Sequence, residues 1–384
     1  MNSIVNGLLD AGHTVKIMAV NSKKYNVTME DIPEDYRQKT GIELIDVDLR
    51  VRPLKAFGNL FSNKSYHVER FISKDFTNRL ISVLKRESYD VVQLETLFMT
   101  PYVETIRKYS KAVIVLRAHN VEHLIWERIA KGTRFFLKRA YINHLARTLK
   151  NYELSAISQV DGIAAITRKD AAFFRKYSAT TTIDIPYGVY PEDFHPNYEV
   201  AEKPQFYHIG SMNWMPNEEG IRWFIDNCLE AVVAKVPDFV FHLAGRNMPE
   251  WLKSLKNPHI DVIGEVPDAK EFVANHDVAI VPLLSGSGIR IKIIESMAMG
   301  KTVVTTLVGA EGILYDEDVN IIIAENKAKM AEAIRRINEN PSIAEEIGKA
   351  ARKLVEDLYD NRKITERLLL FYEQIKPSSK ITFV

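Results

Sequence analysis

Cysteine is nearly absent from this sequence of 384 residues, whose single thiol belongs to Cys228. A lone cysteine excludes intramolecular disulfide bonds and thiolate metal clusters. The ten histidines show no HExxH spacing, so the sequence supports no metal site. No apolar run approaches the roughly 20 residues that a membrane-spanning helix needs. The opening MNSIVNGLLDAGHTV lacks the basic start and long apolar core of a secretion signal. We therefore expect a cytoplasmic protein without a metal, whose contact with the inner face of a membrane could only be peripheral.

Net charge is equally small, because 51 Lys and Arg nearly balance 50 Asp and Glu and leave +1. A balance of this kind gives no reason to expect nucleic acid as a partner. Hydrophobic residues at 46% and charged residues at 26% are ordinary for a globular protein. The chain exceeds the usual size of one domain, about 100 to 200 residues, so two domains are expected.

Short β-rich runs alternate with helical patterns almost throughout the chain, which predicts α/β domains with parallel sheets and crossover helices. The predicted strands fall into two series. The first series comprises residues 15–20, 91–93, 112–116, 162–166 and 181–185. The second series comprises residues 205–209, 239–244, 260–263, 278–281, 302–305 and 321–323.

A stretch dense in proline and polar residues, PYGVYPEDFHPNYEVAEKP, separates the two series and marks the domain boundary. We expect a first domain at 1–190, a linker at 191–204 and a second domain at 205–360. A last helix within 361–384 is expected to cross back to the first domain. Two such halves would enclose a cleft, and open parallel sheets bind ligands beyond the carboxyl ends of their strands.

The start of the chain departs from this pattern. A doubly wound domain normally opens on a strand and a glycine-bearing loop, whereas this chain opens on a helical pattern at 3–10. The first domain is therefore expected to lack its first strand.

The segment SGSGIRIKIIESMAMG joins a buried strand to an apolar helix through a glycine-spaced loop. Glycines let backbone N–H groups come close to a ligand, and a helix N-terminus favours phosphate. Lys292 and Glu295 share one helix face, and Arg290 lies at the free first turn of the helix. Two cations suit a diphosphate, and a carboxylate one turn further suits a vicinal diol such as ribose. The spacing alone leaves a plainer interpretation open, in which Lys292 and Glu295 form a surface i,i+3 ion pair.

Longer motifs carry a resemblance to a known family. The segments SGSGIRIKIIESMAMGKTVVTTLVGAEGI, YHIGSMNWMPNEEGIRWF, HLAGR and VIGEVPD closely resemble the carboxyl-terminal domain of GT-B glycosyltransferases of the group 1 type, family 4. RAHNVEHLIWERIA, AAITRKDAAFF and PYGVYPEDFHP are similar to landmarks of the amino-terminal domain. The resemblance implies two Rossmann-like domains facing across a cleft. It also implies a nucleotide-sugar donor, a glycan or lipid-linked acceptor, retention of anomeric configuration and no bound metal.

The resemblance also assigns roles to individual residues. Glu295 matches the glutamate that holds the donor ribose, and Arg290 with Lys292 lies where family members stabilise the diphosphate. His119 matches a histidine that contacts the donor sugar near the reacting carbon. The remaining candidate donor-binding positions follow two strands of the second domain; they are Gly210, Ser211, Gly286, Ser287, Gly288 and Ile289.

Two departures from the family pattern concern charged positions. Many members carry a second glutamate eight positions before the first, where this chain has Ser287. Many also place an arginine and a lysine after the first strand of the second domain, whereas SMNWMPNEEG contains neither. Arg290 and Lys292 are expected to compensate.

Polar residues also follow two predicted strands of the first domain. His119, Asn120 and Glu122 follow the strand that begins at 112, and Glu95 follows the strand at 91–93. We expect His119 to hydrogen-bond a donor hydroxyl and to stabilise positive charge at the anomeric carbon. Glu95, Asn120 and Glu122 are candidates for the acceptor side, although a structural role for Glu95 is equally compatible with the sequence.

Two other patterns were weighed as functional signals. Asp46-Val47-Asp48 spells DxD, but apolar and polar residues alternate through 46–51, which favours a half-buried strand over a metal site. Residues 128–147 interleave basic and aromatic side chains. They fit either an anionic membrane surface or the solvated face of a long core helix.

Alternatives to a retaining glycosyltransferase remain at this point. One is a degenerate GT-B protein that binds nucleotide without turnover. The other is a GT-B-like sugar-nucleotide epimerase. The sequence reveals neither the base, the sugar nor the acceptor, since specificity depends on a few contacts in loops.

Overall fold

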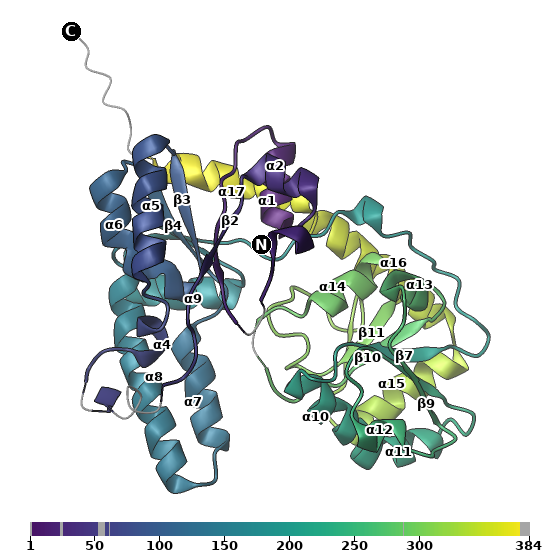
Figure 1. Cartoon of the computed structure of the whole chain (residues 1–384). Helices are drawn as coiled ribbons and strands as arrows, with labels where there is room; N and C mark the ends of the chain where they lie inside the picture. The colour runs from purple at the N-terminus through teal and green to yellow at the C-terminus, as the bar shows by residue number, and fades with distance from the viewer. Residues whose placement is uncertain (1, 24–25, 53–57, 61, 287, 377–384) are drawn as a thin grey trace. The chain divides into compact units, whose positions relative to one another are not determined.

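The computed structural model describes residues 2–23, 26–52, 58–60, 62–286 and 288–376. The chain forms two compact units (Figure 1). Unit 1 comprises Met1–Pro186 together with Thr365–Val384, and unit 2 comprises Tyr187–Ile364. The first division therefore falls at 186/187, inside the PYGVYPEDFHP segment, whereas the sequence placed the end of the first domain at 190.

Unit 1 contains two parallel sheets. Strands β1 (Met18–Asn21) and β2 (Glu43–Asp46) form one of them. The other has the order β3-β4-β5-β6, from β3 (Val91–Glu95), β4 (Val113–Ala118), β5 (Gly162–Ala165) and β6 (Thr181–Asp184). The helices of unit 1 are α1 (Asn2–Asp10), α2 (Glu34–Thr40), α4 (Tyr66–Glu69), α5 (Lys74–Arg86), α6 (Val103–Tyr109), α7 (Glu122–Gly132), α8 (Phe136–Ala156) and α9 (Arg168–Tyr177), with 3-10 turns η1 (Met29–Asp31) and η2 (Leu97–Tyr102).

At the start of unit 1, among the described residues, α1 precedes β1. The alternation read through 46–51 was wrong as a strand, since β2 ends at Asp46 and Val51 is 63% exposed. There, side chains instead of a neighbouring strand form hydrogen bonds with the backbone. Arg70 donates to the Leu49 carbonyl, and the Arg52 N–H donates to the Tyr66 hydroxyl.

The last helix, α17 (Asn361–Ile375), packs its later turns against the sheet of unit 1. A Cβ on Gly162 would meet Phe371 and Ile375 at 2.7 Å, so the glycine permits close approach of helix and strand. The Tyr372 hydroxyl donates to Gln93 on β3. These contacts make the end of the chain part of the core of unit 1.

Unit 2 contains one parallel sheet of order β12-β11-β10-β7-β8-β9. Its strands are β7 (Phe206–Ile209), β8 (Phe241–Ala244), β9 (Ile260–Gly264), β10 (Val278–Val281), β11 (Thr302–Thr305) and β12 (Ile322–Ile323). Its helices are α10 (Met215–Trp223), α11 (Leu229–Val233), α12 (Glu250–Lys253), α13 (Ala269–Ala274), α14 (Ile291–Ala298), α15 (Lys327–Glu339) and α16 (Ser342–Leu358), with the 3-10 turn η3 (Pro191–Asp193) and the π-turn η4 (Phe224–Cys228).

Successive strand residues of unit 2 alternate between two hydrophobic cores, one on each face of the sheet. Phe206, Val278 and Ile280 join the core that contains the buried Cys228, while Tyr207 and Ala279 join the core under α14 and α16. Buried parallel strands covered on both sides by helices make unit 2 a doubly wound domain.

Candidate functional site

The strand order of unit 2 reverses between β7 and β10. The chain proceeds from β7 outward to β8 and β9, and then returns to the other side of β7 as β10. Open α/β sheets bind ligands at the carboxyl ends of the strands that flank such a switch point. Gly210 and Ser211 follow β7, and the loop that includes Gly286 and Gly288 follows β10 and leads into α14. The candidate donor-binding residues therefore lie at the switch point.

Lys292 places its ammonium group at this switch point. Its Nζ donates to Asn217 Oδ1 at 2.7 Å and to His208 Nε2 at 3.2 Å. The amine lies against Gly210, where an added Cβ would overlap Nζ. In the part of the chain that the structure describes, Lys292 forms no ion pair with a carboxylate. Burial, with the nearby charge of Arg290, lowers the pKa of Lys292 to about 7.

His208 is the residue beneath Lys292 that sequence reasoning missed. It is 1% exposed, and its Nδ1 lies 2.8 Å from the Ile280 carbonyl of β10. A carbonyl only accepts, so Nδ1 carries the hydrogen and Nε2 presents a lone pair to Lys292. Burial and the Lys292 charge hold the pKa of His208 well below its usual value, which keeps the ring neutral. The available signal was a lone polar residue inside the buried strand FYHI.

Asn217 was also missed, because it comes from α10 rather than from the loop motif. Its Oδ1 accepts from Lys292, and its Nδ2 donates to the Ser211 carbonyl at 2.9 Å. One amide therefore fixes both the lysine and the loop after β7. Trp214, at the start of α10, is 39% exposed.

Arg290 is buried where α14 begins. It is the N-cap residue and is 4% exposed. Its guanidinium lies against Gly286, where an added Cβ would meet Nη2 at 2.7 Å. The same guanidinium lies 5.4 Å from the centre of the Trp214 ring. The loop after β10 therefore covers part of the Arg290 side chain, which helical spacing alone could not indicate.

The other predicted residues of this loop and helix are found in the loop, against the core or one turn further along α14. Gly286 and Gly288 have φ angles of +117° and +77°, which favour glycine. Ile289 packs partly buried against the core under α14. Glu295 lies on the next turn, where burial raises its pKa while Lys270 acts in the opposite direction. The predicted Ser287 lies outside the described residues.

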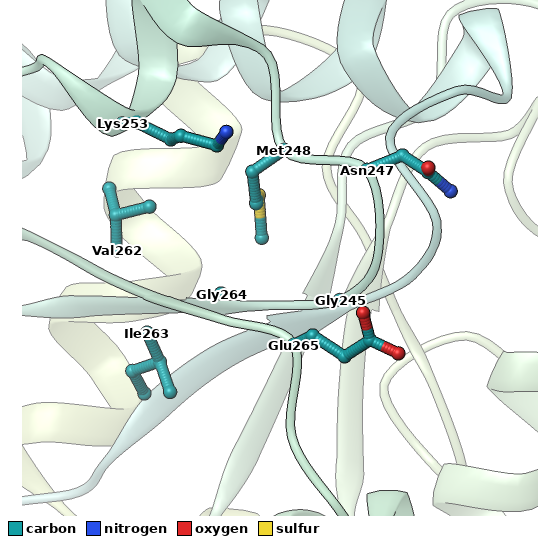
Figure 2. Close-up of a pocket in the computed structure, with 8 residues that line it drawn as sticks. All are labelled: Gly245, Asn247, Met248, Lys253, Val262, Ile263, Gly264 and Glu265. Carbon is teal, nitrogen blue, oxygen red and sulfur yellow. The ribbon is translucent and has the colours of Figure 1, made fainter.

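A recess adjoins the switch point at the carboxyl ends of β8 and β9 (Figure 2). Its volume of about 430 Å³ falls within the range of small-molecule sites. Gly245, at its edge, touches the loop after β7, since an added Cβ would overlap the Gly210 carbonyl oxygen. Apolar and polar side chains share the lining, which comprises Gly245, Asn247, Met248, Lys253, Val262, Ile263, Gly264 and Glu265.

In unit 1, the structure brings the predicted His119 and Glu95 together. His119 follows β4 and Glu95 is the last residue of β3, and His119 Nε2 lies 2.6 Å from Glu95 Oε2. Arg117, 3% exposed, places its Nε 3.9 Å from the same carboxylate oxygen. Burial alone would raise the pKa of Glu95, but the His119 hydrogen bond and the Arg117 charge outweigh it and lower the pKa. Thr96, the next residue, has a φ of +85°, a strained value for a β-branched side chain.

The predicted Asn120 and Glu122 lie beside a buried polar group at the start of α7. Glu153 of α8 accepts from the backbone N–H of Glu122 at 2.9 Å and from His123 Nδ1. Glu122 is 8% exposed, and burial together with the Glu153 charge raises its pKa to about 7. Asn120 hydrogen-bonds Glu122. This group ties the N-terminus of α7 to α8.

Two further searches covered the described residues. They contain no group of three or more His, Cys, Asp and Glu side chains placed to hold a metal ion. None of their helices is long and apolar enough to span a bilayer.

Comparison with known proteins identifies the domain that carries the lysine site. A family model described as glycosyl transferases group 1 matches residues 203–340. Residues 203–340 are a group 1 glycosyltransferase domain. This range of the glycosyltransferase domain includes Gly210, Arg290, Lys292 and Glu295.

Similar proteins match most of the chain. A Klebsiella pneumoniae protein, described as an uncharacterized 44.6 kDa protein in the cps region, is 24% identical over 303 residues, 75% of each chain. Sucrose-phosphate synthase from Thermosynechococcus elongatus matches with a TM-score of 0.68 and 16% identity, over 97% of this chain and 91% of that chain. HepE from Anabaena, in complex with UDP, matches with a TM-score of 0.61 and 13% identity. The match covers 94% of this chain and 100% of that chain. The predicted GT-B fold is confirmed.

Proposed function

We propose that this glycosyltransferase moves a hexosyl group from a nucleotide diphosphate to a glycan or lipid-linked acceptor, with retention of anomeric configuration. The observation that carries the proposal is the ammonium of Lys292, held at the switch point by neutral acceptors. A cation that no carboxylate compensates, beside a glycine loop and a helix N-terminus, suits an anionic diphosphate.

The proposed donor lies across the switch point, with its diphosphate at Lys292 and the N-terminus of α14. Arg290 contributes positive potential from beneath the loop. Glu295 accepts hydrogen bonds from the ribose diol, and the base enters the recess beside Gly245 and Gly264. The remaining donor contacts come from the loop backbone at the positions predicted from the sequence.

In the proposed reaction, negative charge grows on the β-phosphate oxygens as the glycosidic bond breaks. Cations fixed at that point stabilise the transition state more than the ground state. His119, oriented by Glu95, hydrogen-bonds a sugar hydroxyl and stabilises positive charge at the anomeric carbon. The β-phosphate oxygen takes the proton of the acceptor hydroxyl, and no covalent nucleophile or metal is assigned to the reaction.

Two relatives support the chemistry proposed here. HepE is described in complex with UDP and with UDP-glucose, which supports a nucleotide-sugar donor. The Klebsiella relative is described as a protein in the cps region, which supports a role in polysaccharide biosynthesis.

The first test is a screen of UDP, GDP and their sugars by saturation-transfer NMR, followed by a product assay with and without EDTA. We expect one nucleotide sugar to bind and to be consumed only with an acceptor, at a rate that EDTA leaves unchanged. Binding without product would indicate a degenerate protein. An altered nucleotide sugar without acceptor would indicate an epimerase.

The second test is Glu295→Ala, which should weaken nucleotide binding by about 1–3 kcal/mol through the loss of charge-assisted hydrogen bonds. Glu346→Ala, an exposed carboxylate on α16, is the matched control and should bind as the wild type does. Equal affinities of both variants in calorimetry would contradict the assignment of the ribose to Glu295.

A further inference from the structure

Helices α7 and α8 form a hairpin that projects from the sheet of unit 1 (Figure 1). The sequence analysis left two interpretations of 128–147 open, an anionic membrane surface or the solvated face of a long core helix. The structure breaks this segment at 133–135, between α7 and α8. Thr133 caps the end of α7 through its hydroxyl, which donates to the Ile129 carbonyl at 2.8 Å. We call residues 129–139 the hairpin tip.

The hairpin tip exposes apolar side chains in succession. Phe135, Phe136 and Leu137 are 60%, 64% and 58% exposed, and Ile129 on the preceding helix is 44% exposed. The two phenyl rings pack on each other with centroids 5.7 Å apart. Single exposed apolar residues are common on protein surfaces, whereas a contiguous group marks a site of interaction.

The same tip is strongly cationic. Lys131, Arg134, Lys138 and Arg139 are all exposed. The sequence contains no aspartate or glutamate between Glu127 and Glu153. Within the described ranges, these four cations form no ion pair. The tip therefore combines exposed aromatic rings with positive charge that its own helices leave uncompensated.

We propose that the hairpin tip inserts into the interfacial layer of an anionic lipid membrane. Aromatic and leucine side chains enter the boundary between headgroups and acyl chains, and flanking Lys and Arg bind anionic headgroups. Two copies of the tip would bring like charges together, which disfavours self-association through this surface.

The base of the hairpin is anchored by contacts that do not involve the apolar residues of the tip. Leu145 packs with Tyr66, and Leu149 packs with Val68 and Leu97 in a cluster that also contacts Trp126. Substitutions at Phe135, Phe136 and Leu137 therefore leave the core of unit 1 unchanged. The inference goes beyond the proposed function, because membrane binding does not depend on the transfer reaction. It can be measured without donor or acceptor.

The experiment is flotation of the full chain with vesicles of phosphatidylcholine alone or mixed with phosphatidylglycerol. We expect binding to the anionic vesicles, with weaker binding at high salt. The triple variant Phe135→Ser/Phe136→Ser/Leu137→Ser should lower the partition coefficient on the order of a hundredfold. Ile72→Ser, which changes an equally exposed side chain elsewhere in unit 1, is the matched control and should float as the wild type does.

A reporter variant, Phe136→Trp, shows where the tip goes. The fluorescence of the introduced indole should shift to the blue with anionic vesicles and be quenched by brominated acyl chains. Unchanged flotation of the triple variant, or reporter fluorescence that does not respond to the vesicles, would overturn the proposal. So would sedimentation velocity showing dimers that the triple variant abolishes, since the tip would then bind a second copy. Nucleotide binding in calorimetry tests the proposed function independently of each outcome.

Discussion

The two candidate sites of this chain handle charge in opposite ways. In unit 2, Lys292 is held by an amide and a neutral imidazole, so its positive charge is not cancelled by its hydrogen-bond partners. In unit 1, His119 pairs with Glu95, and buried Arg117 lies beside the same carboxylate. The first arrangement suits an anion and the second suits neutral hydroxyl groups. Under the proposed function, this difference places the diphosphate at Lys292 of unit 2 and the sugar at His119 of unit 1.

The largest effect expected from this comparison is on turnover. His119→Ala removes the group proposed to face the sugar, and turnover should fall by about a hundredfold or more. Affinity for the nucleotide diphosphate alone should stay within about twofold, because His119 is not expected to contact the phosphates. Rapid-quench kinetics and calorimetry measure the two quantities. A large loss of affinity for the diphosphate would contradict the proposal that the diphosphate binds at unit 2 and the sugar at His119.

A smaller effect is expected on binding when the cation of unit 2 is removed. Lys292→Gln should weaken binding of the nucleotide diphosphate by about 2–3 kcal/mol, the value of a hydrogen bond to a charged group. The nucleoside without phosphates should bind equally to both proteins. Lys327→Gln, at an exposed position of α15, is the control. Equal loss for nucleoside and diphosphate would mean that Lys292 supports the fold of the site and does not contact phosphate.

The smallest effect concerns pH. With its pKa near 7, Lys292 loses its proton as pH rises through neutrality, so diphosphate affinity should fall about tenfold per unit above that point. His208→Phe removes the lone pair that stabilises the ammonium, and the midpoint should move to lower pH. Affinity should then recover in acid. Calorimetry from about pH 5.5 to 8.5 measures the shift, and an unchanged midpoint would show that His208 does not position Lys292.

Continuous β-branched runs made parts of unit 2 predictable from the sequence. The strands at 278–281 and 302–305 were predicted to the residue, because Val, Ile and Thr in both runs are buried on two faces. In unit 1, β2 was missed because the alternation continues past its end, where side chains of Tyr66 and Arg70 replace a neighbouring strand. The alternation of apolar and polar residues indicates which side chains are exposed. It does not show which group forms hydrogen bonds with the backbone.

The candidate site was predictable where its residues share one motif. Lys292 and Glu295 follow from helical spacing, but Asn217 and His208 approach Lys292 from α10 and β7, 75 and 84 positions away in sequence. The burial of Arg290 depends on how a loop closes over it. The break between α7 and α8 was missed because Gly132 and Thr133 are weak signals on their own.

The contact between Gly210 and Gly245 limits how this surface can evolve. Even a methyl group on Gly245 would collide with the neighbouring main chain, and one on Gly210 would displace the amine of Lys292. Bare peptide groups therefore form the floor where a flat base and a phosphate chain would meet. If the proposed donor binds here, changes of donor preference would arise from the surrounding walls, such as Met248 and Ile263, because a side chain at Gly210 or Gly245 would overlap neighbouring atoms.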